Sequence, residues 1–322
     1  MIRSQRHPGP GSAPLRRPRA LLLAAVAAVG VLLAGCGGGS SDPLATQPAA
    51  PSAQGTVRIG SANFTENRLL AEIYASALET RGVAVERRFG IGSRETYFPA
   101  LQNGEIDLVP DYTGNLLQFL NPQATATASD QVYQQVSGAL PPQLQLLQQS
   151  AAEDKDAVVV TRAFATQNNL RSIDDLTPLC PTVAFGGPPE FQQRSYGVPG
   201  LQRLYNCSFR EFRALDAGGP LTVAALRDGT VQAADLFTTD ASIPENDFVV
   251  LEDPRSNFAA QNVVPLVNRA KSADPRVTDT LNQISAAMDT TQLTQLNQRL
   301  AGPDRPDPAT VARDWLNSAG IR

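Results

Sequence analysis

Hydrophobic and polar residues follow the same order in residues 100–114 (ALQNGEIDLVPDYTG) and residues 225–239 (ALRDGTVQAADLFTT). In each stretch an Ala-Leu pair ends a helix, a glycine follows that can take the left-handed conformation that stops a helix, and a short apolar strand comes next. Each strand ends on an aromatic residue followed by threonine, at Tyr112 and at Phe237. Because ligands of open α/β sheets bind at the carboxyl ends of strands, the repeat predicts two similar lobes facing one ligand. The alternative is chance similarity between two helix–strand joints.

The segment from Thr56 to Gly114 predicts strand, helix, strand, helix and strand. Strands are expected at residues 56–60, 83–89 and 106–109, and Asn63 with Glu66 has the spacing of a capping box at the first helix. Right-handed crossovers place the three strand ends on one edge, where two helix N-termini favour an anionic group. The polar and aromatic residues expected on that edge are Ser61, Asn63, Thr65, Ser93 and Tyr112. The alternative for each polar residue is a helix cap.

Two apolar segments, residues 157–161 and residues 262–267, are expected to carry the chain into the second lobe and back out. Strands are predicted between them at residues 182–185, 209–215 and 231–237, and residues 130–150 read as a connecting helix with a Pro-Pro break. From Pro275 onward the apolar spacing predicts three amphipathic helices. The chain therefore returns to the first lobe after the second one.

Arg194 lies in the predicted helix after a Gly-rich turn, four residues beyond Glu190. An arginine can hold a carboxylate with two parallel hydrogen bonds. The sequence leaves two readings open, a ligand contact and a surface ion pair with Glu190.

The first 35 residues have the pattern of a lipoprotein signal peptide. Five arginines precede an apolar run of about fourteen residues, which is shorter than the roughly twenty needed to span a bilayer. The ending Leu-Ala-Gly-Cys resembles a bacterial lipobox, which predicts acylation of Cys36; the alternative is an ordinary signal peptide. Residues 36–55 are rich in Gly, Ser, Pro and Ala and are expected to form a flexible tether.

Cleavage before Cys36 would remove five of the 27 basic residues and none of the 31 acidic ones, which leaves a net charge of minus nine. This balance argues against nucleic acid as a partner, and against membrane contact other than through the lipid. The single histidine, His7, would also be lost. With no mature histidine, nucleophile motif or metal-ligand spacing, a secreted enzyme is disfavoured, and no catalytic residue, metal or cofactor is expected.

Two further cysteines, Cys180 and Cys207, lie in the part of the chain expected to be exported. A disulfide between them would persist outside the cytoplasm and would stabilise the fold by about 3 kcal/mol in the chain-entropy model. The alternative is a pair of buried free thiols.

Five stretches resemble, in order, the substrate-binding lipoproteins of osmoprotectant ABC importers, which bind glycine betaine, carnitine and choline. They are IGSANFTENRLLAEIYASALE, GSRETYFPALQNGEIDLVPDYTG, GGPPEFQQRSYGVPGL, FTTDASI and DFVVLEDPRSNF. The resemblance implies an α/β class II periplasmic-binding fold with two lobes and two crossing hinge segments. It implies a first lobe at residues 56–156, a second at 157–262, and a return with C-terminal helices at 263–322. The implied partners are a small solute and the permease subunits, at the outer face of the cell membrane.

In such proteins aromatic rings surround the quaternary ammonium group and an arginine holds the ligand carboxylate. Matched motif by motif, the resemblance assigns Tyr112 and Phe237 to the cage, and it matches Glu190 and Arg194 to the family's glutamate and carboxylate-binding arginine after the Gly-rich turn. The predicted ligand-binding residues are Asn63, Thr65, Ser93, Asp111, Tyr112, Glu190, Arg194, Phe237, Thr238 and Gln261.

The chain departs from the family pattern at three positions. Ala62 stands where a lysine is frequent, and Ala157 and Gln261 stand where tyrosines contribute to the cage. A cage of four rings would shrink to two, which would cost about 1–4 kcal/mol of binding free energy. The sequence thus predicts either weak binding of betaine-type solutes or a preference for a larger or less cationic ligand.

Overall fold

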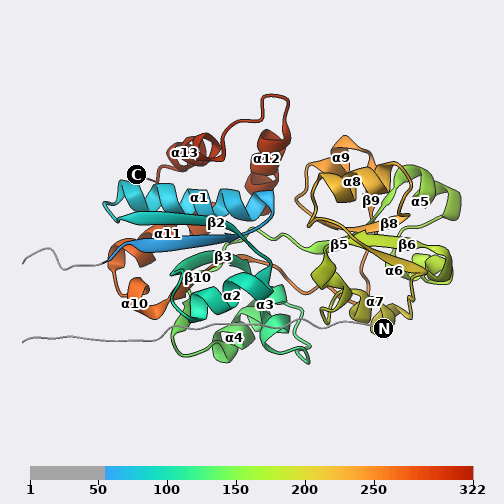
Figure 1. Cartoon of the computed structure of the whole chain (residues 1–322), viewed down its shortest axis with the longest axis horizontal. Helices are drawn as coiled ribbons and strands as arrows, with labels where there is room; N and C mark the ends of the chain where they lie inside the picture. Colours follow the sequence, from blue (N-terminus) through green and yellow to red (C-terminus); the bar gives the residue numbers. More distant parts are fainter. Residues whose placement is uncertain (1–54, 322) are drawn as a thin grey trace, which may run out of the picture. The chain divides into compact units, whose positions relative to one another are not determined.

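The computed structural model describes residues 55–321, so the predicted signal peptide, Cys36 and residues 36–54 of the tether lie outside the described residues. Two five-stranded sheets form the framework of the described part (Figure 1). Within residues 55–321, no helix is long and apolar enough to cross a membrane.

The first sheet contains β1 (Val57–Ala62), β2 (Val85–Gly92), β3 (Leu108–Tyr112), β4 (Leu144–Leu146) and β10 (Val263–Asn268). Their order is β2-β1-β3-β10-β4, with β1 parallel to β2 and β3, and β10 antiparallel to β3 and β4. One face is covered by α1 (Thr65–Thr80), α11 (Pro275–Ala287) and α13 (Pro308–Ser318), and the other by α2 (Arg94–Gln102), α3 (Thr113–Leu120) and α4 (Ser129–Ala139) (Figure 1). The short α10 (Arg269–Ser272) precedes α11, and α12 (Thr290–Ala301) precedes α13.

The second sheet contains β5 (Asp156–Thr161), β6 (Ala184–Gly187), β7 (Glu211–Ala214), β8 (Ala233–Phe237) and β9 (Phe248–Val250). Their order is β7-β6-β8-β5-β9, with β6 parallel to β7 and β8, and β5 antiparallel to β8 and β9. Its helices are α5 (Arg162–Asn168), α6 (Ile173–Leu176), α7 (Val198–Tyr205), α8 (Pro220–Arg227) and α9 (Ser242–Glu245), with 3₁₀ turns η1 (Thr177–Thr182) and η2 (Pro189–Gln192). The two sheets therefore share one spatial order of strand directions, although β10 is the last strand of its sheet along the chain and the equivalent β5 is the first.

The predicted repeat is confirmed down to the backbone. Gly104 and Gly229 both end their helices in the left-handed region, at φ values of 71° and 73°. Tyr112 pairs with Val263 at the start of β10, and Phe237 pairs with Asp156 at the start of β5. The two aromatic residues thus occupy equivalent places in the two sheets.

Two segments connect the sheets and run antiparallel beside each other. The amide of Asp154 donates to the carbonyl of Gln261 at 3.1 Å, and the amide of Val263 donates to the carbonyl of Ala152 at 3.0 Å. The first segment leads into β5 of the second sheet and the other leads back into β10 of the first. These backbone bonds make a paired hinge of the two crossings.

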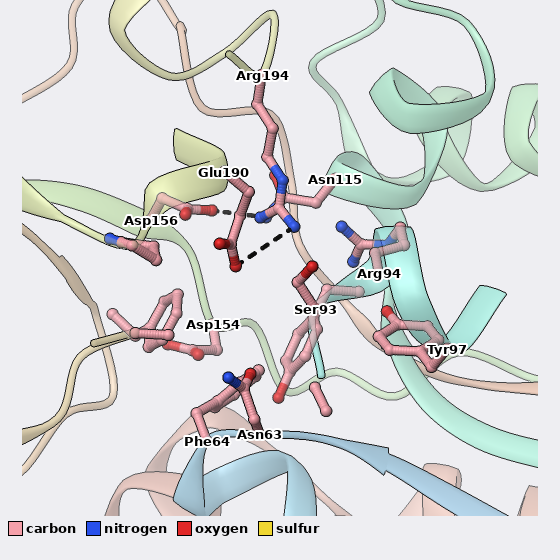
Figure 2. Close-up of a pocket in the computed structure, with 15 residues that line it drawn as sticks. Asn63, Phe64, Ser93, Arg94, Tyr97, Asn115, Asp154, Asp156, Glu190 and Arg194 are labelled. Carbon is pink, nitrogen blue, oxygen red and sulfur yellow. Dashed lines mark hydrogen bonds and ion pairs between the residues drawn. The ribbon is translucent and has the colours of Figure 1, made fainter. Parts of the chain in front are cut away.

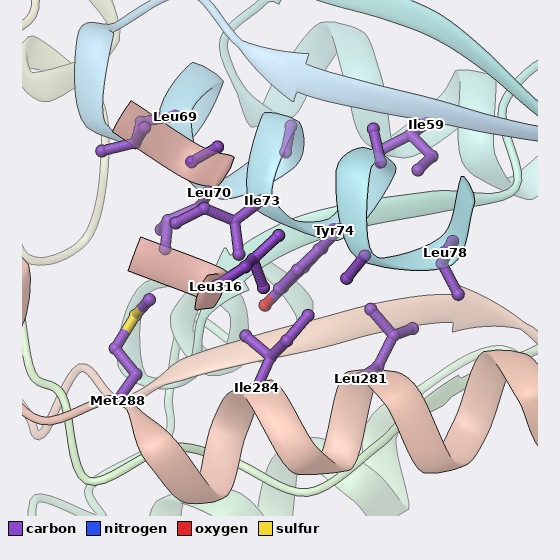
Figure 3. Close-up of a cluster of buried hydrophobic side chains, with 14 of the residues drawn as sticks. Ile59, Leu69, Leu70, Ile73, Tyr74, Leu78, Leu281, Ile284, Met288 and Leu316 are labelled. Carbon is purple, nitrogen blue, oxygen red and sulfur yellow. The ribbon is translucent and has the colours of Figure 1, made fainter. Parts of the chain in front are cut away.

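The helical spacing of apolar residues explains why α1 lies on the first sheet (Figure 3). Its buried face meets α11 and α13, and Tyr74 and Trp315 belong to this core. Truncating one of the fully buried leucines to alanine would cost about 2–5 kcal/mol of unfolding free energy. The side chains that form this contact include Leu69, Leu70, Ile73, Leu78, Leu281, Ile284 and Leu316.

Three local predictions are wrong. The N-cap of α1 is Phe64 and not Asn63, and no side chain caps this helix. Glu66 does not complete a capping box, because its buried carboxyl group accepts a hydrogen bond from Tyr112 instead. Arg194 lies in the turn between η2 and α7, since the chain after Glu190 forms only a 3₁₀ turn. The connecting helix ends at Ala139, and β4 follows at the edge of the first sheet.

The predicted Cys180–Cys207 disulfide is present.

Candidate ligand-binding site

The candidate site is a cavity between the carboxyl ends of strands from the two sheets (Figure 2). Phe64 follows β1, and Tyr112 ends β3 of the first sheet. Phe237 ends β8, and Glu190 and Arg194 follow β6 of the second sheet. The cavity is lined by Ala62, Asn63, Phe64, Ser93, Arg94, Tyr97, Tyr112, Asn115, Asp154, Asp156, Pro188, Glu190, Arg194, Ala217 and Phe237.

Four aromatic residues line this cavity. The ring of Phe64 is close to two of the others: its centroid lies 5.9 Å from that of Tyr112 and 5.0 Å from that of Phe237. Tyr97 contributes the fourth ring, and the guanidinium carbon of Arg94 lies 6.0 Å from its centroid. The cavity lining thus contains Phe64 and Tyr97 in addition to Tyr112 and Phe237, the two rings that the family resemblance assigned to the cage.

The ring of Tyr112 is fixed by a buried carboxyl group. Its hydroxyl donates to Oε1 of Glu66 at 2.7 Å, and Oε2 of Glu66 accepts from the Thr239 hydroxyl at 2.5 Å and from Nδ2 of Asn297 at 2.6 Å. Burial raises the pKa of Glu66, although these hydrogen bonds oppose the shift. Because Thr239 belongs to the second sheet's side and Glu66 to α1, this cluster also joins the two lobes.

Arg94, in the cavity wall, forms an ion pair with a buried aspartate behind it. Its Nη2 lies 2.5 Å from Oδ1 of Asp111, which also accepts the amide of Tyr112 at 2.7 Å. The Asp111 side chain is fully buried and does not line the cavity. Asp111 therefore neutralises Arg94 and positions Tyr112, which differs from the predicted ligand contact.

Arg194 is paired with a carboxylate from the other lobe. Its Nε and Nη2 donate to the two oxygens of Glu95 at 3.0 and 2.9 Å, and Nη1 donates to the Tyr196 hydroxyl at 2.8 Å. The Glu190 carboxylate is more distant, 3.8 Å from Nη2. Partial burial raises the pKa of Glu95, but the hydrogen bonds and charge of Arg194 outweigh this and lower that pKa to about 2.

Three aspartates lie at or behind the cavity wall on the second lobe's side. Asp154 and Asp156 line the cavity, and Nδ2 of Asn115 donates to Oδ2 of Asp156 at 2.6 Å. Asp235 is 1% exposed, and its Oδ1 has no hydrogen-bond partner among residues 55–321. Burial is the main cause that raises the pKa of each of the three. A buried cation would favour their charged forms.

Besides the aromatic pair, four predicted site residues line the cavity and four lie outside its lining. Asn63, Ser93, Glu190 and Arg194 line it, and Gln261 lies behind it, where its Oε1 accepts the amide of Asn115 at 2.9 Å. The other three outside the lining are Thr65, which is exposed, Asp111, which pairs with Arg94, and Thr238, whose hydroxyl accepts the Lys155 amide.

Sequence reasoning missed several residues that line the cavity. They are Ala62, Phe64, Arg94, Tyr97, Asn115, Asp154, Asp156, Pro188 and Ala217. A usable indication existed for Phe64 and Tyr97, since aromatic residues directly beside expected strand ends and helix starts face the same edge of the sheet. Within residues 55–321, no group of three or more His, Cys, Asp or Glu side chains could hold a metal ion.

The chain is similar to known proteins over most of its length. Residues 55–318 match the family model described as the substrate binding domain of ABC-type glycine betaine transport system. The chain is 27% identical over 277 residues to the glycine betaine-binding protein YehZ of Escherichia coli strain K12, which covers 82% of this chain and 90% of that protein. It is 28% identical over 276 residues to a glycine-betaine-binding protein of Pseudomonas aeruginosa PAO1, covering 81% and 87%.

Solved structures share the fold. A crystal structure titled glycine betaine/carnitine/choline ABC transporter has a TM-score of 0.65 at 19% identity and covers 82% of this chain and 99% of that one. Ligand-free YehZ from Escherichia coli has a TM-score of 0.58 at 26% identity, covering 83% and 99%. These neighbours are two-lobed substrate-binding proteins.

The family sets the general role of the protein. Its members are extracytoplasmic substrate-binding proteins and not enzymes; they bind small solutes and interact with the permease subunits of ABC importers. The chain belongs to the family of substrate-binding domains of ABC-type glycine betaine transport systems.

Proposed function

We propose that the protein binds a quaternary ammonium solute of the glycine betaine type in the cavity between its two lobes. The observation that carries the proposal is the set of rings contributed from both sides, with Phe64 5.0 Å from Phe237. A trimethylammonium group has no N–H to donate, so it binds best against ring faces, each worth about 0.5–2 kcal/mol. Because Phe64 and Phe237 belong to different lobes, a ligand held between their rings would couple binding to lobe closure.

The charged wall supports a cationic headgroup. Asp154 and Asp156 line the cavity, and burial raises the pKa of both carboxyl groups, so a cation bound beside them would favour their charged forms. Four lining rings argue against the alternative in which a depleted cage forces a less cationic ligand. That alternative is retained as an outcome of the binding measurements below.

Isothermal titration calorimetry with glycine betaine, choline, carnitine and proline tests the proposal. The two quaternary ammonium headgroups of choline and betaine should compete for one site, and Phe64→Ala should weaken binding about 2- to 30-fold, the value of one ring. Phe89→Ala is the matched control, because Phe89 is also half-buried against the first core but does not line the cavity. Binding of proline with no binding of the quaternary ammonium compounds would favour the less cationic ligand.

We also propose that a lipid on Cys36 anchors the protein at the outer face of the cell membrane. The support is the basic stretch, the apolar run and the Leu-Ala-Gly-Cys ending of residues 1–36. Mass spectrometry of the membrane-extracted protein should find an acylated N-terminal Cys36. The Cys36→Ser variant should lose the acyl mass, and an unmodified wild-type Cys36 would contradict the anchor.

A further inference from the structure

The carboxylate-binding edge of Arg194 is already occupied in the closed protein. Glu95 lies in the first turn of α2 on the first lobe, and Arg194 lies between η2 and α7 on the second. Their fork-to-fork contact uses Nε and Nη2 with both Glu95 oxygens, at 3.0 and 2.9 Å. While Glu95 occupies this edge, a ligand carboxylate cannot use it for a bidentate contact and is left with the Nη1–Nη2 edge.

The remaining donors of Arg194 offer little to a ligand carboxylate. Nη1 donates to the Tyr196 hydroxyl at 2.8 Å, and the Glu190 carboxylate lies 3.8 Å from Nη2. The guanidinium therefore faces two carboxylates, one from each lobe, and its side chain is only 17% exposed. A third carboxylate at this position would meet like charges on both sides.

The other arginine in the wall does not supply a free cation either. Arg94 is paired with Asp111 at 2.5 Å, and both side chains are buried. Asp154, Asp156 and Glu190 also line the cavity, so carboxyl groups outnumber the two guanidinium groups there. The charges of the described lining thus favour a ligand with net positive charge over a zwitterion.

We propose that Glu95 is a specificity-determining residue: it takes the place of a ligand carboxylate on Arg194 and makes the closed protein prefer quaternary ammonium cations without a carboxylate over zwitterions. This inference rests on the proposed binding of quaternary ammonium solutes in the same cavity. A zwitterion such as glycine betaine must displace Glu95 from Arg194, whereas choline leaves that pair intact. Glu95 also holds the lobes together, so displacing it opposes closure.

Calorimetric titration of the wild type and Glu95→Gln with choline and with glycine betaine tests this role. We expect the wild type to bind choline more tightly than betaine, by about tenfold or more, the order of one charge-assisted hydrogen bond. Glu95→Gln should tighten betaine by about tenfold and change choline by less than about threefold. The amide oxygen in Glu95→Gln could still accept a hydrogen bond from Arg194, and Glu95→Ala has no such acceptor. Glu95→Ala should therefore shift the choline-to-betaine affinity ratio in the same direction.

The matched control is Glu86→Gln, because Glu86 is an exposed glutamate paired with Arg88 on β2 and lies outside the cavity lining. Its choline-to-betaine ratio should equal that of the wild type. Two results would refute the role of Glu95 while the proposed function stands, provided that both solutes bind. One is a choline-to-betaine affinity ratio that does not respond to either Glu95 variant. The other is tighter binding of betaine than of choline by the wild type. If neither solute binds any of the folded variants, the proposed function itself fails, and the inference fails with it.

Discussion

The Thr239 hydroxyl donates a 2.5 Å hydrogen bond to Oε2 of Glu66, although the two residues are 173 positions apart in the chain. The same hydroxyl oxygen lies 2.9 Å from Oδ1 of Asp154 in the hinge and accepts a hydrogen bond from Nδ2 of Asn297 at 3.0 Å. One hydroxyl from the second lobe thus joins the hinge, α1 and α12. Because the Glu66 carboxylate also holds Tyr112, this contact connects lobe closure to the geometry of the rings.

Thr239→Val should weaken the closed form. Valine keeps the shape of the side chain but removes the hydroxyl, which leaves buried carboxyl oxygens with fewer donors at a cost of about 1–3 kcal/mol. Small-angle scattering of the ligand-free variant should show a larger radius of gyration, and the ligand Kd should rise. Thr238→Val is the control, because the neighbouring Thr238 is exposed and its hydroxyl accepts the Lys155 amide and lies 3.4 Å from Asp154, whereas the bond to Glu66 comes from Thr239. An unchanged radius and Kd in Thr239→Val would contradict this role.

Tyr112→Phe should separate the ring from its hydroxyl. The ring stays in the cavity, but Oε1 of Glu66 loses its 2.7 Å donor, which we expect to lower the unfolding free energy by about 1–3 kcal/mol. Tyr112→Ala is a poorer test, since Tyr112 is 6% exposed and belongs to the first core as well as to the cavity. Denaturant unfolding measures the loss, and calorimetry should find that Tyr112→Phe retains most of the affinity. A Phe variant as stable as the wild type would show that the Glu66 contact contributes nothing.

The ligand-free protein should lose stability as the pH rises from mildly acidic to alkaline values. Burial raises the pKa of Glu66 above its ordinary 4.5 and the pKa of Asp154 well above its ordinary 3.8. A carboxyl group with a raised pKa in the folded state binds its proton more tightly there than in the unfolded state. Its stabilising contribution is therefore complete below the ordinary pKa and is lost as the pH passes through the raised one.

Thermal unfolding between about pH 5 and about pH 8 measures this slope. Glu66→Gln and Asp154→Asn should each flatten it, because the amide stays neutral throughout. A saturating cationic ligand should also reduce the loss at high pH, since it favours the charged carboxylates. A melting temperature that rises steadily over this range in the ligand-free wild type would contradict the assignment.

Reduction of the Cys180–Cys207 disulfide should destabilise the second lobe. The bridge joins residues separated by 27 positions, so opening it should cost about 3 kcal/mol of unfolding free energy in the chain-entropy model. The enclosed segment carries Glu190 and Arg194, and we therefore expect weaker ligand binding as well. Thermal unfolding with and without a reducing agent measures the effect. The Cys180→Ala, Cys207→Ala double variant should start from the lower melting temperature and should not respond to the reductant.

Local sequence was sufficient for the repeated architecture and for its aromatic ends. Gly104 and Gly229 take the left-handed conformation that the helix endings require, and Tyr112 and Phe237 end equivalent strands. These features depend on backbone preference and apolar spacing within about fifteen residues, which a sequence displays directly. The five ordered motifs gave the family, because they preserve the same local elements.

Only the tertiary structure decided what the polar and charged residues do. Glu66 fits a capping box but instead contacts Tyr112 and Thr239, and Arg194 pairs with Glu95, 99 positions away, ahead of its local neighbour Glu190. A carboxylate or guanidinium can cap, pair or bind a ligand with similar local geometry, and the choice depends on which distant group folding brings within about 3 Å. The sequence therefore determined the two lobes and their rings, whereas the folding of distant segments against one another determined the charges between them.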